Sequence, residues 1–418
     1  MTTIQDTIRA RRTIRDLSDD GIRGQRLLVR ADFNVPVGPD GTVTDAARIE
    51  ATVPTLEELL DRGANLVLVS HRGRPKEGPD RAHSLAPAAE ALQERMGVET
   101  AFHPWLPGVD LTSIGGLGGE PSTPLPDARV VLLENVRFHP SETANDPEFA
   151  RNLGDLGAHF VSDAFGSAHR AHASTVGAAE VIRERGGEAV AGLLMARELR
   201  YLGDVLSSPE RPFVGLLGGA KISGKLEVIE SVLERVDTLL LGGAMANTFL
   251  YSLGLEVGDS LVEVELADAA RAIMENAGER LVLPVDCVVS DRIDGDAVTR
   301  AVERDAVEPG DRIGDIGPAT RLLFRQALLE AETVIWNGPM GVFEQKPFAE
   351  GTLAVAEAVA EVTDRGGTTV VGGGDSAAAA RQASVTERMT HVSTGGGASL
   401  DYLARKPLPG VEVLTPKD

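Results

Sequence analysis

The chain has 418 residues, a charged fraction of 25% and a net charge of −22. That length predicts two domains rather than one hydrophobic core, and the acidic charge argues against nucleic acid and anionic membranes as partners. The single cysteine, Cys287, excludes an intramolecular disulfide framework and favours a reducing compartment.

Other features of composition bear on where the protein works. No apolar run approaches the ~20 residues of a membrane span, and the first residues lack the apolar core of a signal peptide, so we expect a cytoplasmic protein. Only six of its 41 basic residues are lysines. An acidic, lysine-poor surface suits a cytosol with molar salt, where the Debye length is ~3 Å, so we expect a halophilic protein. Residues 1–12 match no pattern that we can assign.

The first half alternates strands with helices. We predict strands at 26–30, 65–70, 130–133 and 159–162, helices at 48–61 and 84–96, and a long loop at 103–127. Repeated βα units imply a parallel sheet covered by helices. Ligands of such sheets bind beyond the carboxyl ends of the strands, so the residues that follow each strand are candidates for a site.

Cationic side chains gather after these strands. They are His71, Arg72, Arg74, Arg137, His139, His169 and Arg170, with Arg48 nearby. The planar fork of arginine binds phosphate and carboxylate through two hydrogen bonds, and Asp32 and Asn34 suit a hydroxyl. These residues predict a small ligand with a phosphate, a carboxylate and a hydroxyl. The alternative for any single arginine is an ion pair with a surface carboxylate.

The second half repeats the alternation with glycine-rich turns. Residues 189–206 read as a helix that connects the two halves. Strands are predicted at 213–217, 238–241, 281–285, 333–336 and 368–371, with a tight turn at 313–318.

Lys221 and Lys225 follow the first of these strands. Residues 219–225 match the first seven positions of a P-loop, but Leu226 stands where that motif needs a Ser or Thr for Mg²⁺, so we reject the motif. We expect both lysines on the first turn of a helix, along one face, with an anion between them. The alternative is a solvated basic turn.

A second anion site is predicted where the strand at 368–371 runs into three glycines, Asp375, Ser376 and an alanine-rich helix. Glycines let backbone N–H groups approach an anion, and the helix dipole favours it. Asp375 fits if it faces Mg²⁺ on a phosphate; the alternative is a capped strand-to-helix turn. No general base stands out, which fits phosphoryl transfer to an acceptor that is already ionised.

At this point the chain resembles the phosphoglycerate kinase family from about Thr13 to its C-terminus. The motifs that carry the resemblance are RADFNVP (30–36), SHRGRP (70–75), LENVRFHP (133–140), DAFGSAHRAHAS (163–174), LLGGAKISGK (216–225), WNGPMGVFE (336–344), GGGDSAAAA (372–380) and STGGGASLDYL (393–403). The resemblance implies an α/β fold of two domains, each a parallel sheet covered by helices on both faces (Rossmann-like), with a cleft between them that closes by hinge bending. It implies reversible phosphoryl transfer between 1,3-bisphosphoglycerate and Mg-ADP, giving 3-phosphoglycerate and Mg-ATP.

The resemblance also assigns roles to residues. The phosphoglycerate would be held by Asp32, Phe33, Asn34, Arg48, His71, Arg72, Gly73, Arg74, Arg137 and Arg170. The nucleotide would be held by Lys221, Lys225, Gly314, Glu344, Gly373, Gly374, Asp375 and Ser376, with Asp375 on Mg²⁺. Arg48, Lys221, Gly395 and Gly396 would stabilise the transferring group.

Domain limits follow as 1–188 for the phosphoglycerate-binding domain, 189–206 for a connecting helix, 207–392 for the nucleotide-binding domain, and 393–418 for a segment that returns to the first domain. We expect a monomer. Arg72, Ser223-Gly224 and the 103–127 loop depart from the family pattern. The competing hypotheses are another two-domain kinase of small acids, a binding protein with a closed cleft, and a catalytically inactive nucleotide-binding scaffold of the same fold.

Overall fold

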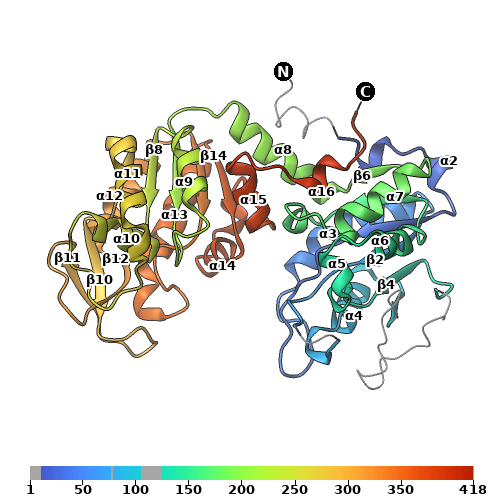
Figure 1. Cartoon of the computed structure of the whole chain (residues 1–418), viewed down its shortest axis with the longest axis horizontal. Helices are drawn as coiled ribbons and strands as arrows, with labels where there is room; N and C mark the ends of the chain where they lie inside the picture. The colour runs from blue at the N-terminus through green and yellow to red at the C-terminus, as the bar shows by residue number, and fades with distance from the viewer. Residues whose placement is uncertain (1–10, 77–78, 105–124, 418) are drawn as a thin grey trace. The chain divides into compact units, whose positions relative to one another are not determined.

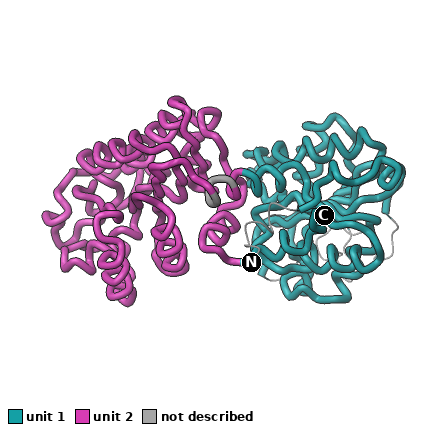
Figure 2. The backbone as a smooth tube through the Cα atoms, turned by 90° about the horizontal axis from the view of Figure 1, so that it is seen from above, with its two compact units in different colours: residues 1–200, 407–418 teal, residues 201–406 magenta. Residues whose placement is uncertain are grey.

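The computed structural model describes residues 11–76, 79–104 and 125–417. The chain forms two compact units, residues 1–200 with 407–418 (unit 1) and residues 201–406 (unit 2), coloured separately in Figure 2. None of the helices in the described part of the chain is long and apolar enough to cross a membrane.

Unit 1 is built on a parallel six-stranded sheet with the strand order β3-β4-β2-β1-β5-β6. Its strands are β1 (Arg26–Arg30), β2 (Asn65–Val69), β3 (Thr100–His103), β4 (Val130–Leu133), β5 (His159–Ser162) and β6 (Ala189–Ala191). Its α-helices are α2 (Asp19–Ile22), α3 (Ala47–Asp61), α4 (Ala86–Met96), α5 (Pro140–Thr143), α6 (Pro147–Gly154), α7 (Ala178–Glu184) and α16 (Pro409–Glu412), and its short 3₁₀ or π helices are η1 (Ile14–Asp16), η2 (Arg81–His83), η4 (Val136–Phe138), η5 (Phe165–Ser167) and η6 (Ala173–Gly177).

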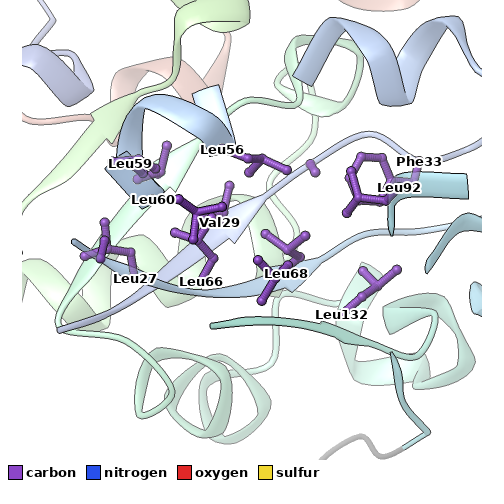
Figure 3. Close-up of a cluster of buried hydrophobic side chains, with 14 of the residues drawn as sticks. Leu27, Val29, Phe33, Leu56, Leu59, Leu60, Leu66, Leu68, Leu92 and Leu132 are labelled. Carbon is purple, nitrogen blue, oxygen red and sulfur yellow. The ribbon is translucent and has the colours of Figure 1, made fainter. Parts of the chain in front are cut away.

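Leucines from the sheet and from two helices form the core on one face of unit 1. Leu27 and Leu66 from the strands pack with Leu56 from α3 and Leu92 from α4, as Figure 3 shows. Side chains alternate between the faces of a strand, and Leu28 on the other face is also completely buried. The second face is covered as well, where α7 packs against β5. Burying each such leucine contributes about 1.5–3 kcal/mol, which ties the helices to the sheet.

Unit 2 has a second parallel six-stranded sheet, with the order β15-β14-β13-β7-β8-β9. Its strands are β7 (Phe213–Leu217), β8 (Thr238–Leu241), β9 (Leu281–Val282), β13 (Thr333–Asn337), β14 (Thr368–Gly372) and β15 (His391–Val392). A separate antiparallel sheet, β11-β10-β12, consists of β10 (Asp286–Ser290), β11 (Arg300–Glu303) and β12 (Arg312–Ile316).

Helices cover this second sheet on both faces too (Figure 1). They are α9 (Leu226–Leu233), α10 (Met245–Ser252), α11 (Ala267–Ala277), α12 (Pro318–Leu329), α13 (Glu350–Asp364), α14 (Gly374–Gln382) and α15 (Gly396–Leu403), with 3₁₀ turns η7 (Val264–Leu266), η8 (Gly278–Arg280), η9 (Lys346–Phe348) and η10 (Thr386–Arg388). Trp336 lies completely buried in the core that α12 and α13 share with the sheet. Helix α8 (Leu193–Ser207) contains the point where the two units meet in the sequence.

The predicted fold class is confirmed: two parallel sheets with flanking helices form two units. Five strands have the predicted limits, because each is a short apolar run bounded by polar or turn residues. The predicted domain limits remain predictions; the units divide at Arg200/Tyr201 and again at Lys406/Pro407.

Three predictions about secondary structure are wrong. Ala189–Ala191 is not helical but forms β6, which pairs with β5. The strand expected at 281–285 stops at Val282, because Pro284 lacks the N–H that a strand would use. The tight turn expected at 313–318 is mostly strand β12.

The predicted loop at 103–127 begins where β3 ends, and this strand was not foreseen. Residues 105–124 of that loop lie outside the described residues.

Candidate active site

A fully buried arginine organises the carboxyl ends of β1 and β2 in unit 1. Arg30 has no exposed surface; its Nε donates to Ser174 Oγ at 2.8 Å, and its Nη2 donates to His71 Nδ1 at 3.0 Å. A guanidinium can only donate, so Nδ1 accepts and the ring proton sits on Nε2. Burial, together with the charges of Arg30, Arg137 and Arg48, holds the pKa of His71 well below its ordinary value. His71 therefore presents a neutral N–H donor.

Asp32 and Arg48 form an ion pair beside this histidine. Both carboxylate oxygens of Asp32 accept from Nη1 of Arg48 at 3.0 Å. Burial would raise the pKa of Asp32, but the nearby positive charges, above all those of Arg48 and Arg30, outweigh burial and lower that pKa. The side chain of Arg48 stays 32% exposed, so a ligand anion can reach its guanidinium from solvent.

Predicted residues that follow β1 and β4 are joined through Gly73, which follows β2. Asn34 Oδ1 accepts the N–H of Gly73 at 2.8 Å, and Nη1 of Arg137 donates to the Gly73 carbonyl at 2.8 Å. Burial lowers the pKa of Arg137 to about 10, and the charges of Arg170 and Arg74 contribute to the shift. Arg74 and Arg170 are exposed. The positive charges of Arg30, Arg170 and Arg74 therefore all act on Arg137, and a bound anion would offset this repulsion.

Two predicted contact residues use their side chains elsewhere. Arg72 donates from Nε to the Val35 carbonyl at 3.3 Å and from Nη1 to the Ser84 carbonyl at 3.0 Å. It thus fastens two backbone segments. The side chain of Phe33 is completely buried in the core, and its N–H donates to Ser70 Oγ at 2.8 Å.

Sequence reasoning missed Arg30 and Glu142. Glu142 is completely buried and accepts from the N–H and the Oγ of Ser174 at 2.9 and 2.6 Å. Burial opposes its charge, but His172, Arg30 and Ser174 hold its pKa below the ordinary value. The available signal for Arg30 was a charged residue ending an apolar strand; Glu142 offered none, because its partner is 32 residues away.

Unit 2 contains a cavity of about 650 Å³ at the carboxyl ends of its strands. Predicted nucleotide residues Gly314, Glu344 and Asp375 line it, together with Gly219 and Pro339. The remaining walls are largely apolar or backbone, as is typical of small-molecule sites with a few polar groups. The cavity thus combines apolar walls with three exposed carboxylates, those of Asp259, Glu344 and Asp375.

The lysine-bearing turn between β7 and α9 differs from the prediction. Helix α9 begins only at Leu226, so Lys221 is in an irregular turn and Lys225 is the N-cap residue. Lys225 folds back, and its Nζ donates to the Gly218 carbonyl at 2.8 Å. Burial lowers the pKa of Lys225, whereas the charge of Asp375 raises it. Gly224, with a φ of 78°, delays the helix start, since few other residues adopt that conformation.

The two predicted glycine turns of unit 2 touch each other. A Cβ on Gly396 would lie 2.8 Å from Cα of Gly373, so only glycine allows this approach. Gly395 donates its N–H to Ser393 Oγ at 3.1 Å as the N-cap residue of α15. The turns at 373–374 and 395–396 therefore form one glycine-lined surface.

Two side chains support this surface. Ser376 is completely buried, and its Oγ accepts the Gly338 N–H at 2.6 Å. Asn337, at the end of β13, has a buried Nδ2 without a hydrogen-bond partner in the described structure. That Nδ2 lies 3.2 Å from the position a Cβ would take on Gly373. A polar donor that the sequence analysis missed thus adjoins the glycine turn.

Similarity to known proteins settles the family. A family model described as phosphoglycerate kinase matches residues 14–406. The chain belongs to the phosphoglycerate kinase family.

Phosphoglycerate kinases from several organisms are similar to this chain over nearly its full length. The phosphoglycerate kinase of Rubrobacter xylanophilus is 51% identical over 413 residues, covering 98% of this chain and 99% of its own. That of Chloroflexus aggregans is 50% identical over 408 residues, covering 97% and 98%. Among solved structures, the phosphoglycerate kinase of Coxiella burnetii is 36% identical with a TM-score of 0.78, covering 96% of this chain and 98% of its own.

The residues suit the Mg²⁺ that this family implies. Mg²⁺ usually keeps several waters and is bound by one or two carboxylates plus substrate phosphates. Asp375 is exposed at the first turn of α14, lines the cavity and lies near Lys225. In the described part of the chain no group of three or more His, Cys, Asp or Glu side chains could hold a metal. A single carboxylate therefore fits a metal that arrives with the nucleotide.

Proposed function

We propose that this protein is a phosphoglycerate kinase that transfers a phosphoryl group reversibly between 1,3-bisphosphoglycerate and ADP, giving 3-phosphoglycerate and ATP. The observation that carries the proposal is the family match over residues 14–406, in which Arg48, Lys221 and Asp375 are all present. We propose that the protein acts as a monomer in the cytoplasm.

Unit 1 would hold the phosphoglycerate. The neutral Nε2–H of His71 donates to it, and the exposed Arg74 and Arg170 bind its phosphate or carboxylate. Arg48 is already charged and solvent-accessible beside Asp32, so it neutralises charge on the group in flight. We assign Arg72 to the scaffold of this site, because its Nε and Nη1 donate to the carbonyls of Val35 and Ser84.

Unit 2 would hold the nucleotide in its 650 Å³ cavity. Glu344 accepts from the ribose, while Lys225 and the glycine turn face the phosphates. Asp375 would hold Mg²⁺, which supplies charge neutralisation on the phosphate oxygens. Lys221 is exposed and can follow the transferring group.

In the direction of ATP use, a carboxylate oxygen of 3-phosphoglycerate attacks the γ-phosphorus as the bond to the leaving oxygen of ADP breaks. The acceptor is ionised at neutral pH, so no base is required, and alignment with charge neutralisation supplies the catalysis. Because acceptor residues belong to unit 1 and nucleotide residues to unit 2, we propose that hinge closure brings the two ligands together.

The test is turnover of 3-phosphoglycerate with Mg-ATP by the purified protein across a KCl series. We expect the wild-type protein to turn over 3-phosphoglycerate and the Arg48→Ala variant to be inactive. Nucleotide binding without turnover at any salt concentration would instead indicate the inactive scaffold.

Salt dependence is part of the proposal. With a net charge of −22 and six lysines, we expect turnover to rise with KCl as like charges are screened. Full activity and stability in dilute buffer alone would leave the kinase standing and contradict the halophilic assignment.

A further inference from the structure

The turn between β7 and α9, residues 218–225, is called the lysine turn below. It binds the carboxylate of Glu263 from a distant segment of the chain. Oε2 of Glu263 accepts the N–H of Ile222 at 2.6 Å and the N–H of Ser223 at 3.0 Å. Glu263 lies 41 residues after Ile222 in the chain, at the N-cap of η7. Successive backbone N–H groups that point at one oxygen form an anion-binding nest. The nest between Lys221 and Lys225 is thus filled by the protein itself.

This contact separates the turn from a P-loop, which its sequence resembles at residues 219–225. In a P-loop the equivalent N–H groups cradle phosphates of the nucleotide. Here two of them are committed to Glu263, so phosphate recognition falls to the lysine side chains and to the glycine turns.

The carboxylate is itself held in place and is charged. The Glu263 N–H donates to Thr248 Oγ1 on α10 at 3.1 Å. Burial is slight and opposes ionisation, but hydrogen bonds from Ser223 and Ile222 and the charge of Lys221 hold its pKa below the ordinary value. Glu263 therefore connects α10 to the turn and stands beside a lysine.

The turn is fixed at two points. At one end Lys225 Nζ donates to the Gly218 carbonyl. In the middle Ile222 is completely buried and its N–H is bound by Glu263. Without Glu263, the N–H groups of Ile222 and Ser223 lose their acceptor, and the segment around Lys221 is held by the buried side chain of Ile222 and by the backbone hydrogen bond from the Lys225 N–H to the Ile222 carbonyl. Gly219 and Gly224 flank this segment with positive φ, and glycine has the widest backbone freedom of any residue, so the segment is easily displaced.

We propose that Glu263 is a positioning residue that presets the lysine turn for the nucleotide phosphates by occupying its backbone nest. This inference rests on the proposed function, because it assumes that Lys221 and Lys225 contact nucleotide. It assigns Glu263 no contact with substrate.

The experiment compares Glu263→Ala and Glu263→Gln with Glu265→Ala, which removes an exposed acid of the same segment. Charge-assisted hydrogen bonds exceed neutral ones in strength, so Glu263→Ala should weaken Mg-ATP binding and raise the KM for ATP by about three- to tenfold. The side-chain amide introduced by Glu263→Gln still offers an acceptor oxygen, so this variant should lie between wild type and Glu263→Ala. The KM for 3-phosphoglycerate should stay unchanged.

Calorimetric binding of Mg-ATP and the ¹⁵N amide resonances of Ile222 and Ser223 in deuterated protein complete the test. Glu263→Ala should shift both resonances, and Glu265→Ala should shift neither. Equal ATP affinity of Glu263→Ala and Glu265→Ala would overturn the proposal. So would unmoved amides, or a loss that affects both substrates equally and follows the melting temperature.

These outcomes separate this proposal from the kinase assignment. A wild type that binds Mg-ATP without turnover would refute the kinase, yet the binding and resonance comparisons would still decide the role of Glu263. A wild type that binds no nucleotide would refute both.

Discussion

Asp163 should make unit 1 less stable as pH rises towards neutrality. This residue follows β5 and is completely buried; Oδ1 accepts the Met195 N–H at 3.1 Å near the start of α8, and Oδ2 has no hydrogen-bond partner in the described structure. Burial raises the pKa of Asp163 to about 7, because the hydrogen bonds from Thr55, Met195 and Leu194 offset desolvation only in part.

The sign and size of this pH effect follow from the linkage between proton binding and folding. The pKa is about 7 in the folded state against an ordinary value of 3.8, so between these values the folded chain binds the extra proton. Stability from this group is therefore complete below the unfolded pKa and is lost as pH rises through the folded pKa. A difference of about three pKa units at 1.36 kcal/mol each corresponds to about 4 kcal/mol.

The assay is native-state hydrogen exchange of β1 and β5 peptides from about pH 4 to about pH 8, in wild type and Asp163→Asn. Other carboxylates titrate too, so the informative quantity is the difference between the two proteins. Wild type should lose up to about 4 kcal/mol of unit 1 stability relative to Asp163→Asn across this range.

Asp315 in unit 2 provides a matched control. Burial raises its pKa to about 7 as well, against hydrogen bonds from Gly351 and Ile316. Asp315→Asn should flatten the pH dependence of unit 2 peptides and leave that of β1 and β5 unchanged. A wild-type minus Asp163→Asn difference that is constant over the whole range would refute the reasoning.

The other predictions concern the site. Arg30→Met should cost unit 1 about 3–5 kcal/mol in urea unfolding, because the buried carboxylates of Asp32 and Glu142 lose a nearby positive charge. ¹⁵N NMR of His71 should then show mixed ring tautomers, since Nδ1 loses its donor; a single unchanged tautomer would contradict the role of Arg30. Gly396→Ala should lower kcat by about 10²-fold, since its Cβ would displace Gly373 by roughly an ångström, and wild-type turnover would exclude that close approach. Arg72→Leu should destabilise unit 1 by about 1–3 kcal/mol with the KM for 3-phosphoglycerate unchanged, and a raised KM would return Arg72 to the ligand.

The sheets were predictable because buried parallel strands have a strong local signal. Residues 213–217 form a continuous apolar run, and all of them are buried. Such a run predicts a buried parallel strand without any knowledge of the strands that pair with it. The antiparallel sheet was not predictable in the same way. Strand β11 is mostly exposed and has no apolar alternation, so only its pairing with β10 defines it.

The candidate site was predictable as a set of residue types but not as a set of contacts. The arginines that follow the strands indicated an anion site, but the sequence alone does not give the orientation of each guanidinium. Arg72 looks like its neighbour Arg74 in sequence, but its reach matches two backbone carbonyls, and Arg74 stays exposed. Burying a donor is favourable only where an acceptor meets it, and that depends on loops distant in sequence.

The conformation of the lysine turn also depends on a contact that is distant in sequence. The i, i+4 spacing of Lys221 and Lys225 fits a helix, and nothing local forbids one except Gly224. Besides the positive φ of Gly224, Glu263 favours the unwound conformation, because it offers the N–H groups of Ile222 and Ser223 a charged acceptor outside the helix. A helix would leave its first N–H groups to a cap or to water, whereas a carboxylate from a distant segment binds two of them at once. The turn therefore stays unwound, and Lys221 lies ahead of the helix with an exposed side chain.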